Sequence, residues 1–299
     1  MATAQAACRD DPERNYKKKM KPEIILDLPL LVGESPVWDD RKNELLFVDI
    51  RGKCFYRMDY ATGKYEKTDL PQLVGCLALC GNDDLLISLE DGVYRFTDGA
   101  LTPAHKITKL KGERFNDGKV GPDGYYYVGT AGENFSGAFY RLGKDGLVGL
   151  FDRCGCSNGL DWTADGKVMY YCDSREQKLE RFDFDAMSHT VSRRSTITEI
   201  PLAVGSGDGM TIDADGNLWL AVWGGSRVLH IDPVSGKTLD EIVLPAGQVS
   251  SCCFAGDDLG DLIITTAAVR TDLTKEPLAG RIFRVRPGVK GVKFSRYRF

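Results

Sequence analysis

Four side chains that carry oxygen recur at one position of a repeated pattern in this 299-residue sequence. Glu34, Asn116, Asn158 and Asp208 each stand 8 to 10 residues before a short apolar run that follows a turn. Any one of them could be an ordinary turn residue. Pointing into one cavity, however, they would leave charge and polar atoms unsatisfied without a cation or water among them. The pattern therefore predicts one divalent metal ion: such oxygens favour Ca²⁺, Mg²⁺ or Mn²⁺, and Zn²⁺ is possible if water completes its shell.

The apolar runs that follow these positions indicate how the chain is organised. They begin 40, 40, 43, 50 and 44 residues apart, and they read LLFVDI after Glu44, LLISLE after Asp84, YYYVGT after Gly124, VMYYCD after Lys167, LWLAVW after Asn217 and LIITTA after Asp261. A period of about 40 to 50 residues with four short strands in each repeat is typical of propeller blades. We therefore predict an all-β fold, a six-bladed β-propeller over residues 22–299 with a central metal site.

Each repeat also has a shorter apolar strand ahead of its aligned run, and the oxygen-bearing position begins that strand. In a propeller this strand is the innermost one, so its first residues should face the central channel. Gly75 and Ser251 occupy the same position in the two remaining repeats. The apolar stretch at residues 23–31 should supply the missing strand of the last blade and close the ring.

Composition argues against several classes of protein. The formal net charge is -4 and no Lys/Arg stripe recurs, so nucleic acid is not an expected partner. No apolar run approaches the roughly 18 to 20 residues that span a bilayer, so we expect no membrane insertion. Nine irregularly spaced cysteines and the lack of a signal-like segment favour a reduced cytoplasmic protein. We expect residues 1–21 to form a flexible extension, and the chain to be a monomer or a weak homo-oligomer.

Other residues could carry chemistry or be structural. Arg114 offers a planar fork of donors to hydroxyls or an oxyanion, with a salt bridge between blades as an equal alternative. Glu133 and Asn134 lie in a loop expected near the same face, and could belong to a solvated turn instead. The segment GCSNG at residues 155–159 matches a nucleophile elbow, but a strand pattern follows it where a helix is required. None of the three histidines stands at a ring position, which disfavours a Ser-His-Asp triad.

Several long motifs in order resemble the SMP-30/gluconolactonase/LRE family, which includes regucalcin and sugar lactonases. The motifs are GESPVWDD at residues 33–40, RFNDGKVGPDG at 114–124, SNGLDW at 157–162, DGMTIDADGNLW at 208–219, SSCCF at 250–254 and PLAGRIFRV at 277–285.

This resemblance implies a role for each matching residue. It implies metal ligands at Glu34, Asn158 and Asp208, and substrate contacts at Arg114 and Asn116. Asp208 is also the implied group for proton transfer. An acidic substrate contact of the family aligns with Asn134, leaving Glu133 one place early.

The resemblance and the ring of oxygen ligands together predict a metal-dependent lactonase of the gluconolactonase type. Its substrate would be a sugar (aldono) lactone, a cyclic ester made when an aldose is oxidised. Two other functions stay open. An exposed Lewis acid can also activate phosphoryl esters, as in a phosphotriesterase or another esterase. The similarity to regucalcin also allows a calcium-binding regulatory propeller.

Overall fold

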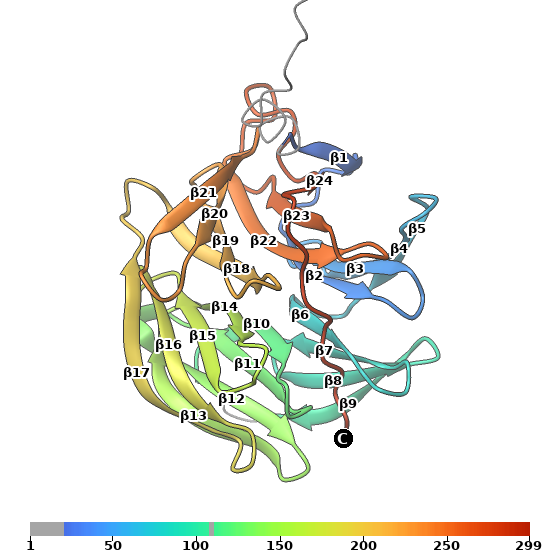
Figure 1. Ribbon diagram of the computed structural model, residues 1–299. Coiled ribbons are helices and arrows are strands. Elements are labelled where there is room, and N and C mark those ends of the chain that lie inside the picture. Colours follow the sequence, from blue (N-terminus) through green and yellow to red (C-terminus); the bar gives the residue numbers. More distant parts are fainter. Residues whose placement is uncertain (1–20, 108–110) are drawn as a thin grey trace, which may run out of the picture.

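The computed structural model describes residues 21–107 and 111–299, and these ranges are built from β-strands (Figure 1). The predicted extension at residues 1–21 lies, apart from Lys21, outside the described residues. No helix in the described ranges is long and apolar enough to cross a membrane.

Sixteen strands form four antiparallel sheets of four strands each. The first sheet holds β2 (Gly33–Asp39), β3 (Glu44–Asp49), β4 (Cys54–Asp59) and β5 (Tyr65–Asp69). The second holds β6 (Val74–Leu79), β7 (Leu85–Leu89), β8 (Gly92–Thr97) and β9 (Ala100–Lys106). The third holds β10 (Arg114–Val120), β11 (Tyr126–Ala131), β12 (Gly137–Gly143) and β13 (Gly146–Cys154). The fourth holds β14 (Ser157–Trp162), β15 (Val168–Asp173), β16 (Lys178–Asp185) and β17 (Thr190–Glu199).

The remaining eight strands share one hydrogen-bonded sheet made of two halves. One half holds β18 (Ser206–Ile212), β19 (Leu218–Trp223), β20 (Arg227–Ile231) and β21 (Thr238–Val243). The other holds β22 (Gln248–Ala255), β23 (Asp261–Ala267), β24 (Ile282–Val285) and β1 (Glu23–Leu26). A single register pair, Trp223 with Gln248, joins the halves. Because β1 pairs with β24, the N-terminal strand completes the last four-stranded group, as the sequence predicted.

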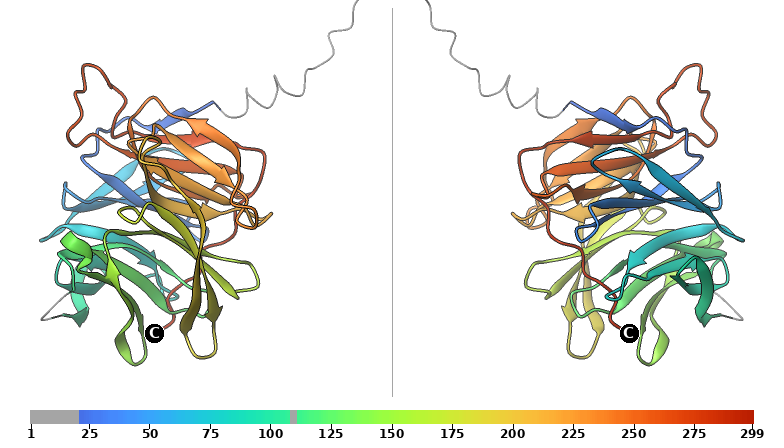
Figure 2. Two further views of the ribbon diagram at one scale, coloured as in Figure 1. Left: turned by 90° about the vertical axis from the view of Figure 1, so that its left-hand side faces the viewer. Right: turned by 90° about the vertical axis from the view of Figure 1, so that its right-hand side faces the viewer.

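The first strands of the four-stranded groups lie around a central axis. In order, β2, β6, β10, β14, β18 and β22 each contact the next, and β22 contacts β2 again, so the fold is β-propeller-like. The side views in Figure 2 show how the differently coloured sheets follow one another around the molecule. Glycine permits the closest approaches: a Cβ at Gly75 would clash with backbone carbonyls of Phe115 and Asn116, and one at Gly159 would lie 2.5 Å from the Asp208 carbonyl oxygen.

The six aligned apolar runs are the second strands β3, β7, β11, β15, β19 and β23. Their side chains are buried between neighbouring sheets; for example, Leu45, Leu46, Phe47 and Val48 of β3 are all 0 % exposed. A strand covered on both faces reads as a continuous apolar run, which is why these segments were the clearest signal in the sequence. The outer strands β5, β9 and β17 are mostly exposed, and β5 and β17 are mostly polar.

The last residues of the chain run across one face of the ring (Figure 1). Their backbone bonds to three different groups of strands: Gly291 N–H donates to Leu259 O at 2.8 Å, and Tyr297 N–H donates to Leu79 O at 2.9 Å. Arg298 N–H donates to the Gly124 carbonyl at 3.2 Å. This C-terminal segment therefore ties separate sheets together at that end of the channel.

Asp213, just after β18, is a buried anchor of the sheet that β18 begins. Its carboxylate accepts hydrogen bonds from Trp219 Nε1 at 2.9 Å, His230 Nε2 at 3.1 Å and the Asn217 amide at 2.9 Å. Burial alone would raise the pKa of Asp213, but these hydrogen bonds outweigh it and lower the pKa below its ordinary value. The ionised form is therefore the stable one inside the fold.

We expect Asp213→Asn to lower the free energy of unfolding at pH 7 by about 2 to 4 kcal/mol, because the buried donors lose a charged acceptor. A lowered folded-state pKa gives stability that is present above the unfolded pKa and lost as the pH falls through the folded pKa. The difference in unfolding free energy between wild type and Asp213→Asn should therefore decrease as the pH falls. Denaturant titrations at several pH values measure it, with Asp257→Asn, an exposed aspartate, as the control. Equal stability of the Asp213 variant and wild type at pH 7 contradicts the assignment.

Candidate active site

All six inner strands are irregular at the position that the sequence pattern singled out. Each shifts register against its neighbour, between Glu34/Val37, Val74/Cys76, Phe115/Gly118, Ser157/Leu160, Gly207/Met210 and Val249/Ser251. A bulge inserts an unpaired residue and can re-aim its side chain. The bulges leave Asn116, Asn158 and Asp208 out of the strand pairing, whereas Glu34 still pairs with Val48 just before its bulge. All four side chains line the same cavity. A glycine follows Asn158 and Asp208 directly, a signal for bulges that the sequence interpretation did not use.

Five of the predicted site residues meet in one cavity of about 380 Å³. Glu34, Asn158 and Asp208 line it and are only 6, 5 and 6 % exposed. Arg114 and Asn116 line the same cavity. This volume falls within the range of small-molecule sites.

Asn116 connects Arg114 to Asn158. The Arg114 Nη1 donates to Asn116 Oδ1 at 2.6 Å and to the Phe115 carbonyl at 3.0 Å. In turn, Asn116 Nδ2 donates to Asn158 Oδ1 at 3.2 Å and to the Ser157 carbonyl at 2.8 Å. The guanidinium and both amides are therefore held in fixed relative positions.

Ser174, which the sequence interpretation missed, orients Asn158 from the other side. Asn158 Nδ2 donates to Ser174 Oγ at 2.7 Å, and Ser174 Oγ donates to the Gly207 carbonyl at 2.6 Å. The amide nitrogen of Asn158 is thereby engaged, and its oxygen accepts from Asn116 Nδ2. No sequence spacing could reveal this partner, because Ser174 lies in the turn after β15 and belongs to no repeat motif.

Electrostatics make the two buried carboxylates unusual. Burial, followed by the negative charges of Asp208 and Asp117, raises the pKa of Glu34 well above its ordinary value, and Arg114 opposes the shift only in part. Burial and the charge of Asp117 likewise raise the pKa of Asp208 well above the ordinary value, again against Arg114. Both carboxylates therefore require a compensating positive charge or a bound proton, because their pKa values stay raised in spite of the nearby Arg114 guanidinium.

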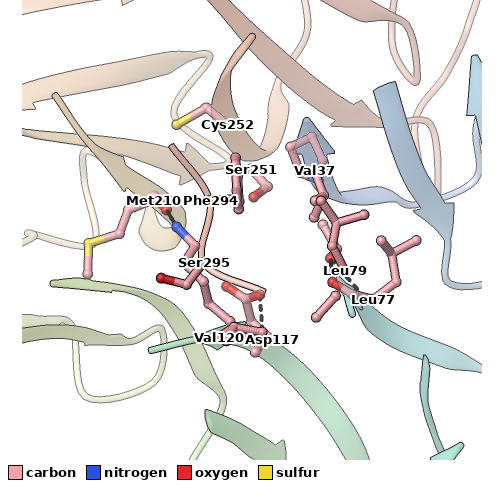
Figure 3. Close-up of a pocket in the computed structure, with 15 residues that line it drawn as sticks. Val37, Leu77, Leu79, Asp117, Val120, Met210, Ser251, Cys252, Phe294 and Ser295 are labelled. Atoms are coloured by element: carbon pink, nitrogen blue, oxygen red, sulfur yellow. Dashed lines mark hydrogen bonds between the residues drawn. The ribbon is translucent and has the colours of Figure 1, made fainter. Parts of the chain in front are cut away.

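A second, smaller cavity of about 20 Å³ lies between the inner strands and the C-terminal segment (Figure 3). Asp117, Ser251 and Ser295 are among the side chains around it in Figure 3. Its volume suffices for one water molecule. Burial raises the pKa of Asp117 to about 6. Beside it, Lys119 Nζ lies 2.7 Å from an Asp161 carboxylate oxygen, so Lys119 is used in a structural ion pair.

The structure does not bring Glu133 and Asn134 into the large cavity. They form the exposed 3₁₀ turn η1 (Glu133–Phe135), outside the residues that line it. The turn adjoins the mouth, because Arg175 Nη1 donates to the Gly132 carbonyl at 3.0 Å and Arg175 lines the cavity. A substrate contact from Glu133 or Asn134 stays a prediction.

Nucleophilic serine or cysteine chemistry finds no support here. Ser157 begins β14, is fully buried and packs against Gly129, and no helix follows it. His189 lies 2.9 Å from Asp123 and does not line the cavity. Burial raises the pKa of Cys156, beside the two asparagines, to about 12, so its thiol stays protonated.

No cluster of three or more His, Cys, Asp or Glu side chains that could hold a metal ion occurs in the described part of the chain. The candidate set here has two carboxylates, Glu34 and Asp208, and is completed by the amide oxygen of Asn158.

Comparison with known proteins identifies the family of this chain. The model of the SMP-30/gluconolactonase/LRE-like region matches residues 32–268. Regucalcin of Danio rerio is 38% identical over 286 residues, which cover 91% of this chain and 97% of that protein. A luciferin-regenerating enzyme structure superposes with a TM-score of 0.87 at 29% identity, covering 93% of this chain and 99% of the other.

A regucalcin from Agrobacterium tumefaciens str. C58, described as a calcium-binding protein, superposes with a TM-score of 0.88 at 26% identity, covering 92% of this chain and 97% of the other. The family match spans most of the chain, and the match to Danio rerio regucalcin covers nearly all of both proteins. This chain therefore belongs to the SMP-30/gluconolactonase/LRE-like family.

Proposed function

We propose that this protein hydrolyses sugar (aldono) lactones to aldonic acids with the help of one divalent metal ion. The observation that carries the proposal is the convergence of two buried carboxylates and an amide beside a fixed arginine in a cavity of about 380 Å³. Family membership supports it, because gluconolactonases belong to the same family.

The chemistry of the donor set fits a divalent cation. Glu34 accepts a backbone hydrogen bond from Ser35 at 2.7 Å, and its carboxylate lies close to that of Asp208. Together with Asp208 it places two carboxylates, both with raised pKa values, in a desolvated site. We assign Glu34, Asn158 and Asp208 as ligands, and oxygen ligands suit Ca²⁺, Mg²⁺ or Mn²⁺, with Zn²⁺ possible. At these ligands the ion would supply a Lewis acid for the lactone carbonyl and make water more acidic.

The protein's own groups account for the rest of the reaction. Asp208 accepts a proton from the attacking water, whose oxygen bonds to the carbonyl carbon of the lactone. Arg114 donates to the oxygen on which negative charge develops, and Asn116 holds that guanidinium in place. The ring C–O bond then breaks, the leaving alkoxide takes back the proton that Asp208 had accepted, and the product is an open-chain hydroxy acid.

We also infer six blades around the metal site. The eight-stranded sheet is held together by one register pair, and each of its halves has four strands, like every other sheet. Counting the halves separately gives the six units that the sequence period predicted.

A cytoplasmic location is part of the proposal, because the eight described cysteines are free thiols, as expected in a reducing compartment.

A calcium-binding role without turnover is the second candidate. The observation that favours it is the similarity to the Agrobacterium tumefaciens regucalcin, described as calcium-binding. The same three ligands would hold the ion in either case. The two functions differ in turnover: an enzyme regains lactone hydrolysis with several divalent ions, whereas a calcium binder shows tight, selective binding and little hydrolysis.

The ligand assignment predicts linked losses of metal binding and activity. Glu34→Gln and Asp208→Asn should each abolish binding of Mn²⁺ or Ca²⁺ to the chelated protein and lower kcat/KM for gluconolactone by about a hundredfold or more. Calorimetric titration and a pH-indicator assay measure the two losses. Asp117→Asn is the matched control: it removes an acidic group of the same channel and should keep one bound ion. Full activity in either variant would contradict the assignment of Glu34 and Asp208 as metal ligands.

The raised pKa values predict that a ligand variant stabilises the metal-free protein. The folded state holds the Glu34 proton more tightly than the unfolded chain does, so stability falls as the pH rises above about 4.3, the unfolded glutamate value. In chelator at pH 7.5, Glu34→Gln should gain on the order of 1 kcal/mol over wild type, and the gain should vanish near pH 4.

Thermal melts with and without metal test this, with the exposed Glu66→Gln as the control. Metal should raise the melting temperature of wild type and leave the melting temperature of Glu34→Gln unchanged. A metal-free Glu34→Gln protein that melts below wild type at pH 7.5 contradicts the account.

Arg114 should act in turnover rather than in metal binding. Arg114→Lys keeps the positive charge but loses the planar guanidinium, in which Nη1 bonds both Phe115 and Asn116 and the other nitrogens can donate to the substrate. We expect kcat to fall by about 10²-fold while one ion still binds. Steady-state kinetics beside a metal titration measure this, and an unchanged kcat rules out the assigned role.

A further inference from the structure

Positive charge gathers around the mouth of the large cavity. Four arginines line it, Arg51, Arg114, Arg175 and Arg270, whereas its acidic lining residues are Glu34 and Asp208 alone. Both acids are buried at the floor and face the proposed metal ion. The chain as a whole carries a formal net charge of -4, whereas the residues that line this cavity include four arginines and two acids and are net positive.

Three of these arginines occupy equivalent places in the fold. Arg51 lies in the turn from β3 to β4, Arg175 in the turn from β15 to β16, and Arg270 in the segment between β23 and β24. Each connection follows the second strand of a four-stranded group. An inner strand begins at the face where the second strand ends, so these connections surround the start of the inner strands, where the metal ligands lie.

The connections that carry the first two arginines are fixed by strand-end aspartates. Asp49 accepts hydrogen bonds from the Gly52 and Val32 amides, both at 2.9 Å. Asp173 accepts from the Arg175 amide at 3.0 Å and the Cys156 amide at 3.1 Å. These carboxylates hold the backbone of both turns against the rim of the cavity.

The third connection is fixed by Gln248, which itself lines the cavity. Its Nε2 donates to the Val269 carbonyl at 2.8 Å and to Thr271 Oγ1 at 3.2 Å, on both sides of Arg270. Arg270 adopts a left-handed backbone conformation with φ 57°, which these bonds help to hold. Hydrogen bonds therefore hold the backbone at Arg51, Arg175 and Arg270, which we call the rim arginines.

The charges of the three rim arginines are not neutralised by ion pairs. No ion pair joins Arg51, Arg175 or Arg270 to a carboxylate among residues 21–107 and 111–299, although 25 contacts between basic and acidic side chains occur elsewhere in these ranges. Arg51, Arg175 and Arg270 are exposed, so water solvates them at little cost. Guanidinium groups without an ion-pair partner can bind a ligand, because their planar forks match carboxylate and phosphate oxygens. Arg175 donates from one nitrogen to the Gly132 carbonyl and has its other guanidinium nitrogens for this role.

We propose that the preferred substrate is a lactone with a second, anionic group, a carboxylate or a phosphate, distant from the reacting carbonyl. This inference rests on the proposed lactonase function and names its substrate class. The reacting ester end faces Glu34, Asn158 and Asp208 at the floor, and the anionic end reaches the arginines at the mouth. The excess positive charge raises the local concentration of anions and favours them over neutral sugars of the same size.

Matched lactones test the proposal on the metal-loaded protein. D-glucaro-1,4-lactone differs from D-glucono-1,4-lactone by a carboxylate, and 6-phospho-D-glucono-1,5-lactone differs from D-glucono-1,5-lactone by a phosphate. We expect kcat/KM at low salt to be about tenfold higher for at least one anionic member over its neutral partner, and the ratio to fall with ionic strength. The two pairs show whether carboxylate or phosphate is the better fit.

The variant that removes the rim charge is Arg51→Gln/Arg175→Gln/Arg270→Gln. It should bring the anionic-to-neutral ratio close to one. The control variant carries the same change in net charge at three exposed arginines outside the cavity, Arg41→Gln/Arg193→Gln/Arg286→Gln, and should keep the wild-type ratio.

Binding gives a readout that does not depend on turnover. Calorimetry should show that D-glucarate, a dianion, binds wild type about tenfold more tightly than D-gluconate at low salt, and that the rim variant loses this difference. Equal kcat/KM within both lactone pairs, or equal binding of glucarate and gluconate, overturns the proposal and leaves the lactonase function intact. If no lactone is hydrolysed with any divalent ion, the proposed function itself falls.

Discussion

The burial of two carboxylates at the centre of the ring is the constraint on which the rest of the structure depends. Glu34 and Asp208 are removed from water, and the negative charge of Asp208 further raises the cost of keeping Glu34 ionised. Such a pair is tolerable only where a cation or protons compensate it. Arg114 lies nearby, but it is tied to Asn116 and Phe115. The proposed metal ion resolves this imbalance.

The fold supplies what this constraint requires. Bulges in the inner strands turn the ring residues into the channel, while the second strands behind them form a dry apolar layer that holds those strands in place. At the mouth, strand-end aspartates such as Asp49 and Asp173 fix the turns. At the opposite end, the C-terminal segment bonds to separate sheets. The sheets thus carry the buried carboxylates, whereas the connections between strands carry the arginines that we propose set substrate preference.

Much of this was predictable because it repeats. The second strands are largely apolar, the period of the repeats indicates their order, and the common phase of Glu34, Asn158 and Asp208 predicted that they share one cavity. What the sequence could not reveal depends on contacts without a period. Ser174 orients Asn158 from a turn in the same sheet. Arg51, Arg175 and Arg270 do share a place in the repeat, after a second strand, but the sequence interpretation did not use this signal. The raised pKa values arise from burial, which spacing alone does not measure.

The most direct test of the central claim is an anomalous diffraction map of crystals grown with Mn²⁺ after chelation. The account predicts one strong peak in the large cavity, within coordination distance of carboxylate oxygens of Glu34 and Asp208 and of the Asn158 amide oxygen. No peak in that cavity, or a single peak at another place on the protein, would contradict the claim that these buried carboxylates exist to hold a metal ion.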